Sequence, residues 1–267
     1  MWKRNKKYIH VAKNSFQEAI IYRVSTLAFF FSEIFSFIFI FYLWTSIYKQ
    51  GGQIGNYELK DLILYYFVSN FLWITIKGTD IAWDVGDEIR MGQITNVLLR
   101  PMRYARYKFS QMLGGLAYRT SVFMVVFMLI GIFLSSYINF NIELKNILFF
   151  IIFFAIGYVI NYFIFYTLGL TTFWLGLVRG FNFSLSVITG FMDGSVIPVD
   201  LLPRIVRNIN DFLPFKYIIF TPVSVFNGKI QVTWETLVIP IAWIIVLYLL
   251  AKFVLNKGIK VYEGYGA

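Results

Sequence analysis

The sequence predicts an all-α membrane protein with six transmembrane helices, and two observations lead to this fold class. Of the 267 residues, 58% are apolar and 14% are charged, and the mean hydropathy is +0.67. Soluble domains average about 45–50% apolar and about 25% charged residues, so lipid is the expected solvent for most of this chain. A spanning helix needs about 20 mostly apolar residues. The length therefore accommodates six spans in a single membrane domain, residues 1–267, without a sizeable soluble domain.

The first 23 residues predict an amphipathic helix. Four basic residues lie near the start, and apolar residues then recur three and four positions apart between Tyr8 and Ile20. This spacing places the apolar side chains on one face of a helix, as is typical of helices that lie in the lipid interface. We expect residues 1–23 to lie on the cytoplasmic membrane surface, with a solvated basic tail as the alternative. Because no signal-peptide pattern is present, we expect the amino terminus to be retained.

Six apolar stretches predict the membrane-spanning helices. They cover about residues 24–48, 59–76, 109–136, 146–174, 179–197 and 234–254. Glu33 lies within the first stretch and Asn70 within the second. A carboxylate at membrane depth is costly, so Glu33 is either a functional residue or a group that pairs near the basic interface. Asn70 is expected to form a hydrogen bond to another helix.

Two connections depart from the apolar pattern. Residues 79–108 mix charged and apolar side chains, so they are too polar to span a bilayer and too apolar for a disordered linker. They predict two short helices at the membrane interface, the second of which ends at Pro101. Residues 191–234 contain four prolines between short apolar pieces. Since irregular backbone at membrane depth must be covered by protein or water, this segment predicts short re-entrant or interfacial helices that cap the bundle.

The distribution of basic residues predicts the orientation. If both ends, residues 79–108 and the turn at Arg179 share one side, that side holds 17 of the 24 lysines and arginines. The excess places both termini and the charged connection in the cytoplasm, which requires an even number of spans. It also accounts for the net charge of +10 through anionic lipid head groups rather than nucleic acid.

The sequence contains no motif for catalysis or metal binding. It has no cysteine, which excludes disulfides and thiolate ligands, and its single histidine, His10, is expected to be a surface residue. No G-x-x-x-x-G-K-[ST] phosphate loop, H-E-x-x-H pair or G-x-S-x-G elbow occurs. We therefore expect no catalytic residue, metal or cofactor in this chain, and a membrane-embedded enzyme is disfavoured.

Two segments carry a resemblance to a known family. The first is W-D-V-G-D-E-I-R-M-G-Q-I-T-N-V-L-L-R-P-M from Trp83 to Met102, and the second is G-F-M-D-G-S-V-I-P-V-D-L-L-P-R from Gly190 to Arg204. The first resembles the charged cytoplasmic segment after the second span of the permease subunits of the ABC-2 family of ATP-binding-cassette exporters. The second is similar to that family's extracellular segment before its last span. The resemblance extends over essentially the whole chain.

This resemblance implies a permease that pairs with a second permease, identical or homologous, and docks two separate ATPase subunits. Those subunits would bind ATP and magnesium and supply the hydrolysis. The implied function is export of an amphipathic or hydrophobic substrate, such as a drug, lipid or peptide, across the cytoplasmic membrane of a prokaryote. Two alternatives stay open: a secondary transporter or channel without ATPase partners, and a membrane assembly factor that transports nothing.

The resemblance and the residue pattern together predict three groups of functional residues. The segment that contacts the ATPase is expected to use polar and apolar side chains at Asp84, Asp87, Glu88, Ile89, Arg90 and Met91. A solvated loop next to the membrane is the alternative for this segment. Glu33 and Asn70 are candidates for the translocation path. The proline-rich cap is expected to form an outward gate that includes Met192, Pro198 and Leu201.

Overall fold

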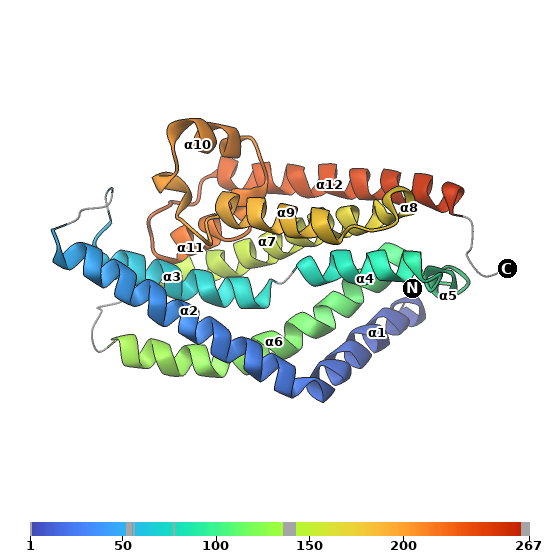
Figure 1. The fold of residues 1–267 in the computed structure, drawn as a ribbon, viewed down its shortest axis with the longest axis horizontal. Coiled ribbons are helices and arrows are strands. Elements are labelled where there is room, and N and C mark those ends of the chain that lie inside the picture. Colours follow the sequence, from blue (N-terminus) through green and yellow to red (C-terminus); the bar gives the residue numbers. More distant parts are fainter. Residues whose placement is uncertain (1, 52–54, 56, 77, 136–142, 263–267) are drawn as a thin grey trace.

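The computed structural model describes residues 2–51, 55, 57–76, 78–135 and 143–262, and it shows a bundle of long helices. The long helices are α1 (Trp2–Ile21), α2 (Arg23–Lys49), α3 (Leu59–Thr75), α4 (Thr79–Arg90), α6 (Tyr104–Ser135), α7 (Leu144–Leu170), α9 (Arg179–Met192) and α12 (Trp234–Val261). The start of α1, the short helix α5 (Ile94–Leu98) and the end of α12 lie at one end of the bundle (Figure 1). We call this the α5 end.

Five helical segments of the described residues have the length and apolarity of membrane spans. They are Val24–Lys49, Leu59–Arg90, Tyr104–Ser135, Leu144–Leu175 and Trp234–Val261. They contain five of the six predicted spans. The remaining prediction, residues 179–197, is too long, because α9 has 14 residues and ends at Met192. The backbone then turns at Gly194, whose φ of +89° lies in the left-handed region that favours glycine.

The charged connection after α3 contains two helices before Pro101, α4 and α5, and their place at the membrane interface stays a prediction. Residues 79–90 form α4, which continues along the bundle toward the α5 end (Figure 1). The reason is an apolar stripe of Ile81, Val85 and Ile89, spaced four residues apart and buried against the rest of the bundle. A Cβ on Gly169 of α7 would lie 2.8 Å from Val85, so α4 and α7 approach closely.

Helix α1 packs along the first half of α6. Its apolar stripe meets α6 through an edge-to-face contact of Phe16 with Tyr118, whose ring centroids are 5.9 Å apart. A Cβ on Gly114 of α6 would lie 2.1 Å from the carbonyl oxygen of Ala12, so only glycine permits this approach. Tyr8 accepts a hydrogen bond from the backbone N–H of Arg103 at 3.0 Å. The predicted N-terminal helix is therefore present, and its apolar face contacts protein.

The core lies around α3 and α7. Leu62, Tyr65 and Leu72 of α3 and Ile160 and Tyr166 of α7 have no exposed surface. By contrast, α2 and the outer faces of α6, α9 and α12 carry many exposed large apolar side chains. A soluble monomer rarely exposes so much apolar surface, and this distribution is the one expected of helices that face lipid or another subunit.

The segment between α9 and α12 forms a cap at the end of the bundle opposite to α5 (Figure 1). It consists of the 3₁₀ turns η1 (Val199–Leu201) and η2 (Phe215–Tyr217) and the short helices α10 (Arg204–Asp211) and α11 (Phe220–Phe226). Proline precedes η1, α10 and η2, as expected where each proline interrupts the preceding backbone pattern. The cap packs closely on α7, because a Cβ on Gly157 would lie 2.7 Å from the carbonyl oxygen of Tyr217.

Candidate functional site

The α5 end presents a short, anchored helix with exposed apolar residues beside it. Ile94 is completely buried and Val97 is 6% exposed, so the apolar side of α5 is fixed to the bundle. Next to them, Leu99 is 81% exposed and Met91 is 56% exposed. Exposed apolar side chains on a rigid protrusion are the kind of contact that anchors a protein partner.

A buried ion pair ties α4 to α6 directly behind this protrusion. Lys108 of α6 donates to one carboxylate oxygen of Glu88 at 2.7 Å, and Tyr104 donates its hydroxyl hydrogen to the other oxygen at 2.7 Å. The side chain of Lys108 is 5% exposed and that of Glu88 is 18% exposed. Charge-assisted hydrogen bonds of this kind are stronger than neutral ones, so the two helices that flank α5 are joined firmly.

The structure divides the six predicted ATPase-contact residues into two sets. Ile89 is buried and Glu88 is mostly buried against Lys108, whereas the other four, Asp84, Asp87, Arg90 and Met91, keep more accessible surface. Asp87 and Arg90 form an exposed ion pair at 3.1 Å. Asp84 lines a polar cavity of about 550 Å³ between α1, α4 and α6. Glu88 therefore has a clear internal role, and contact of the others with a partner stays a prediction.

The two predicted intramembrane polar residues contact each other. Asn70 of α3 donates from its amide nitrogen to a carboxylate oxygen of Glu33 on α2 at 3.3 Å. Asn70 thus makes the hydrogen bond between helices that its position predicts. The pairing also reduces the cost of placing the Glu33 carboxylate within an apolar helix. A place for either residue on a translocation path stays a prediction.

The three predicted gate residues lie in the cap, where side chains connect it to α3. Met192 ends α9, and its carbonyl accepts a 2.7 Å hydrogen bond from the amide of Asn210. Pro198 immediately precedes η1, which contains Leu201. Beside Leu201, Asp200 accepts the hydroxyl hydrogen of Tyr57 at 2.8 and 2.9 Å from its two oxygens.

The hydroxyl of Tyr57 is held in its protonated form. Burial raises the pKa of Tyr57 well above its ordinary value, and the neighbouring carboxylate of Asp200 raises it further. A protonated phenol can donate, and the carboxylate of Asp200 accepts. The contact therefore fixes η1 of the cap to the segment that leads into α3, which is the geometry needed to link the two during any movement of the cap.

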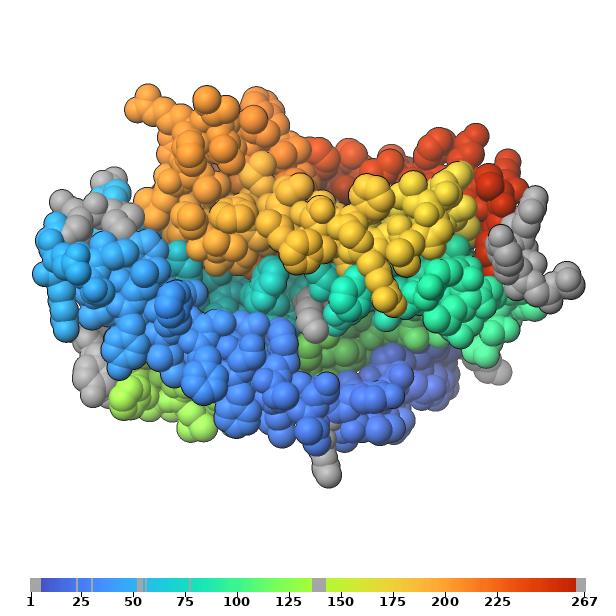
Figure 2. Space-filling view, in the orientation of Figure 1, coloured from blue at the N-terminus to red at the C-terminus, as the bar shows by residue number. Residues whose placement is uncertain are grey.

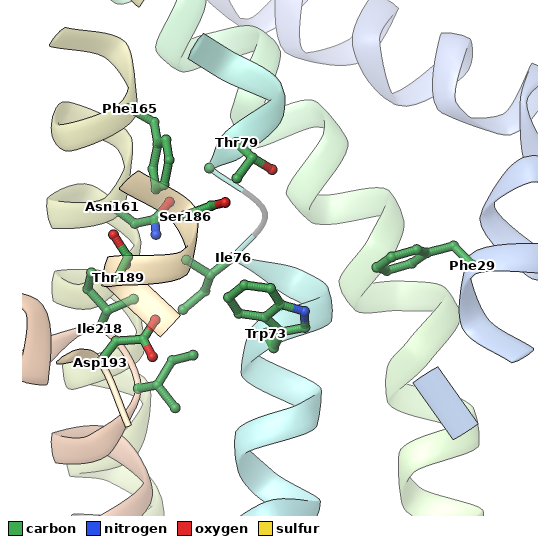
Figure 3. A pocket seen from close by; sticks show the side chains of 12 residues that line it. Phe29, Trp73, Ile76, Thr79, Asn161, Phe165, Ser186, Thr189, Asp193 and Ile218 are labelled. Atoms are coloured by element: carbon green, nitrogen blue, oxygen red, sulfur yellow. The ribbon is translucent and has the colours of Figure 1, made fainter. Parts of the chain in front are cut away.

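A cavity of about 90 Å³ lies where α3 gives way to α4. Trp73 and Ile76 border it near the end of α3, and Asn161 of α7, Thr189 of α9 and Asp193 lie on the opposite side (Figure 3). The space-filling view shows that α3 and α4 are recessed between α2 and α9 on this face of the molecule (Figure 2). The cavity therefore lies beneath a hollow in the outer surface.

The polar side of this cavity is a feature that the sequence reasoning missed. Asp193 is 1% exposed, Thr189 is 2% exposed and Asn161 is 6% exposed. One side-chain oxygen on each has no hydrogen-bond partner among the residues that the structure describes. Two signals were present in the sequence: Asp193 lies in the segment from Gly190 to Arg204, and Asn161 interrupts a long apolar stretch.

Comparison with known protein families gives a match over most of the chain. The sequence profile of a family described as ABC-2 family transporter protein matches residues 34–266. The matched range includes the α4–α5 connection, the cavity and the cap, and it leaves out α1. No curated protein sequence matches the chain.

Proposed function

The chain belongs to the ABC-2 family of transporter proteins, and from this membership we propose that it is the permease subunit of an ATP-driven exporter. Two ATPase subunits and a second permease, identical or homologous, complete the transporter. The substrate is amphipathic or hydrophobic and leaves across the cytoplasmic membrane of a prokaryote. ATP and magnesium bind to the partner ATPases, because this chain has no phosphate loop in its sequence.

The observation that carries the proposal is the attachment of α5. This helix lies between α4 and α6, which are joined behind it by the 2.7 Å ion pair of Glu88 and Lys108. A force applied at α5 is therefore transmitted to both helices together. The exposed side chains of Met91 and Leu99 offer the contact surface through which an ATPase applies that force.

Helix α4 then acts as a rigid connection between α5 and the interior of the bundle. It is 12 residues long, or about 18 Å at 1.5 Å per residue, and it begins at the break after α3. Its buried stripe lies against α7, so movement at α5 shifts α4 along α7 and changes the cavity at the break. Outward release follows when the cap, held to α3 through Tyr57 and Asp200, moves with it.

The orientation supports the same function. With α5 and the two ends of the chain in the cytoplasm, most of the basic residues lie next to the anionic inner surface of the membrane. The bundle then crosses the membrane an even number of times, and the shorter α9 provides the sixth crossing together with the residues that follow it. The cap lies on the outer side.

The test is recovery of an ATPase with the tagged full chain from detergent extracts of its own cells. We expect an ATP-binding-cassette ATPase to be recovered with the wild type. The double change Met91→Asp and Leu99→Asp should reduce that recovery at least tenfold, because two charges replace apolar contacts. Ile205→Asp is the matched control, since Ile205 is 76% exposed but lies in α10 of the cap.

Two results contradict the proposal. The first is the absence of any such ATPase from the wild-type preparation. The second is substrate movement by the purified chain in proteoliposomes without ATP, which would identify a secondary transporter or channel instead.

A further inference from the structure

The cavity at the α3–α4 break has an unusual imbalance of hydrogen-bonding groups. Three of its buried side chains, Asn161, Thr189 and Asp193, each have an oxygen without a partner among the described residues. The other carboxylate oxygen of Asp193 accepts a 2.8 Å hydrogen bond from the backbone N–H of Ser195. None of the ion pairs between described residues includes Asp193. The cavity thus offers three oxygens that can accept a hydrogen bond: an amide oxygen, a hydroxyl oxygen that can also donate, and a carboxylate oxygen with a formal negative charge.

Burial without a charge partner among the described residues makes these acceptors costly. An isolated buried carboxylate is strongly unfavourable, and a buried polar oxygen without a hydrogen bond costs about 1–3 kcal/mol. A ligand that brings a positive charge and several N–H donors removes both costs. A protonated primary amine has this chemistry, because it carries three donors and no acceptor, like the side chain of lysine.

The remaining walls of the cavity favour the same ligand. Phe29, Trp73 and Phe165 line it from α2, α3 and α7. Aromatic faces attract cations, with tryptophan the most effective. The combination of one carboxylate, neutral acceptors and aromatic rings is therefore suited to an ammonium group and unsuited to a phosphate or carboxylate.

The volume limits how much of a ligand can enter. At roughly 30 Å³ for each water-sized group, a cavity of about 90 Å³ holds about three such groups. The remainder of a larger molecule would lie in the hollow between α2 and α9 (Figure 2). Helix α9 also carries exposed apolar side chains, among them Phe183 and Val187. The ligand is therefore amphipathic, with a small head and an apolar tail.

We propose that this cavity is the recognition site for the protonated amino group of an amphipathic substrate, with Asp193 as its counter-charge. The proposal rests on the proposed function as a permease and defines its substrate class. Asn161 and Thr189 accept hydrogen bonds from the same amino group, and the tail lies along α9 toward the lipid.

The experiment measures binding by calorimetry to the full chain, with any partners that remain bound, in phosphatidylcholine nanodiscs at pH 7. Dodecylamine is the probe, and empty nanodiscs give the background from partition into lipid. Dodecyltrimethylammonium has the same tail and charge but no N–H donor and a larger head, and dodecanol has no charge. We expect each of these two compounds to bind at least tenfold more weakly than dodecylamine.

Variants assign the binding to the cavity. Asp193→Asn should weaken dodecylamine binding at least tenfold, and Thr189→Val should weaken it two- to fivefold. Asp211→Asn is the matched control, because Asp211 lies in the cap, is 52% exposed and pairs with Lys216. It should change the affinity less than twofold. Should Asp193→Asn fail to fold, as judged by elution and helical content, Thr189→Val and the two control compounds decide the result.

Equal binding of dodecylamine and dodecyltrimethylammonium overturns the proposal. The proposal is also overturned if folded Asp193→Asn binds dodecylamine with wild-type affinity. The same holds if Thr189→Val binds it with wild-type affinity. These results are separate from the test of the permease function. A chain that recovers an ATPase but shows no selective amine binding refutes only the substrate class. A chain that binds the amine selectively but recovers no ATPase refutes the exporter and leaves the binding site in place.

Discussion

Lys108 and Glu88 form an ion pair between α6 and α4 at 2.7 Å, close to the point where the chain turns through α5. The pair lies 20 residues apart in the sequence and has little exposed surface. It converts two helices and the connection between them into one mechanical unit.

Glu88→Gln should lower the free energy of unfolding by about 2–3 kcal/mol, because it leaves the buried ammonium of Lys108 without a counter-charge. Denaturation of the purified protein in detergent measures the change. Asp87→Asn is the control, since it removes the same type of charge from an exposed pair and should cost less than about 1 kcal/mol. Equal losses of unfolding free energy in the two variants would show that the Glu88–Lys108 pair contributes no more to stability than an exposed pair.

Gly78→Ala should disturb the break between α3 and α4. A Cβ at Gly78 would lie 1.7 Å from the side-chain oxygen of Asn161 and 2.7 Å from the ring of Phe165, so α7 or the break must shift. Overpacking of this kind costs about 1–3 kcal/mol. The temperature of thermal unfolding and the rate of transport should therefore both fall.

Gly180→Ala is the matched control for that change. Gly180 lies at the start of α9, as Gly78 lies at the start of α4, but a Cβ at Gly180 would meet nothing within 4 Å. Alanine is favoured over glycine in a helix by up to about 1 kcal/mol, so this variant should be as stable as the wild type or slightly more so. Identical behaviour of the two alanine variants would refute the close contact with Asn161.

Tyr57→Phe should alter how stability depends on alkaline pH. Burial raises the pKa of Tyr57 above the value of about 10 found in unfolded chains. As pH rises past about 10, the unfolded chain therefore loses its phenolic proton first and binds fewer protons than the folded chain, so stability falls. Phenylalanine cannot contribute to this loss. The variant should be less stable than the wild type by about 1–2 kcal/mol at pH 8, with the difference about 1 kcal/mol smaller at pH 11.

Denaturant unfolding at pH 8 and pH 11 measures this effect. Tyr22→Phe serves as the control, because Tyr22 is 64% exposed, and it should follow the wild type at both values. If the wild type and Tyr57→Phe differ by the same free energy of unfolding at pH 8 and pH 11, then folding does not raise the pKa of Tyr57.

The orientation can be tested by labelling single cysteines, because the sequence contains none. Leu99→Cys places a thiol at an 81% exposed position at the α5 end, and Ile205→Cys places one at a 76% exposed position in the cap. A maleimide that cannot cross membranes should label Ile205→Cys in whole cells and Leu99→Cys only in inside-out vesicles. Labelling of both positions from the same side would contradict the proposed topology.

Much of the architecture could be predicted from the sequence because hydrophobicity is a local property. Five of the six predicted spans correspond to long apolar helices, and the proline-rich cap between α9 and α12 consists of short helices and turns as expected. The membrane as solvent follows from composition alone. The fifth predicted span, residues 179–197, was too long, since the pattern near residue 193 does not reveal that α9 ends at Met192.

The direction of α4 could not be read from the sequence. Its charged residues resemble those of a surface helix, yet Ile81, Val85 and Ile89 pack inside the bundle. The same packing turns Glu88 toward Lys108 and leaves its side chain 18% exposed. Which face of a helix is buried depends on the partner helix, and that partner is distant in the sequence.

Composition, hydropathy and short motifs are sufficient to predict the lipid solvent, the helical class, the approximate spans and the family. The pairing of polar groups becomes visible in the folded chain: Glu33 with Asn70, Glu88 with Lys108, and Asp193 beside Asn161 and Thr189 around one cavity. The hydrophobicity of a segment depends on its own residues, so it can be predicted locally. The partners of a buried polar group come from distant parts of the sequence that only folding brings together.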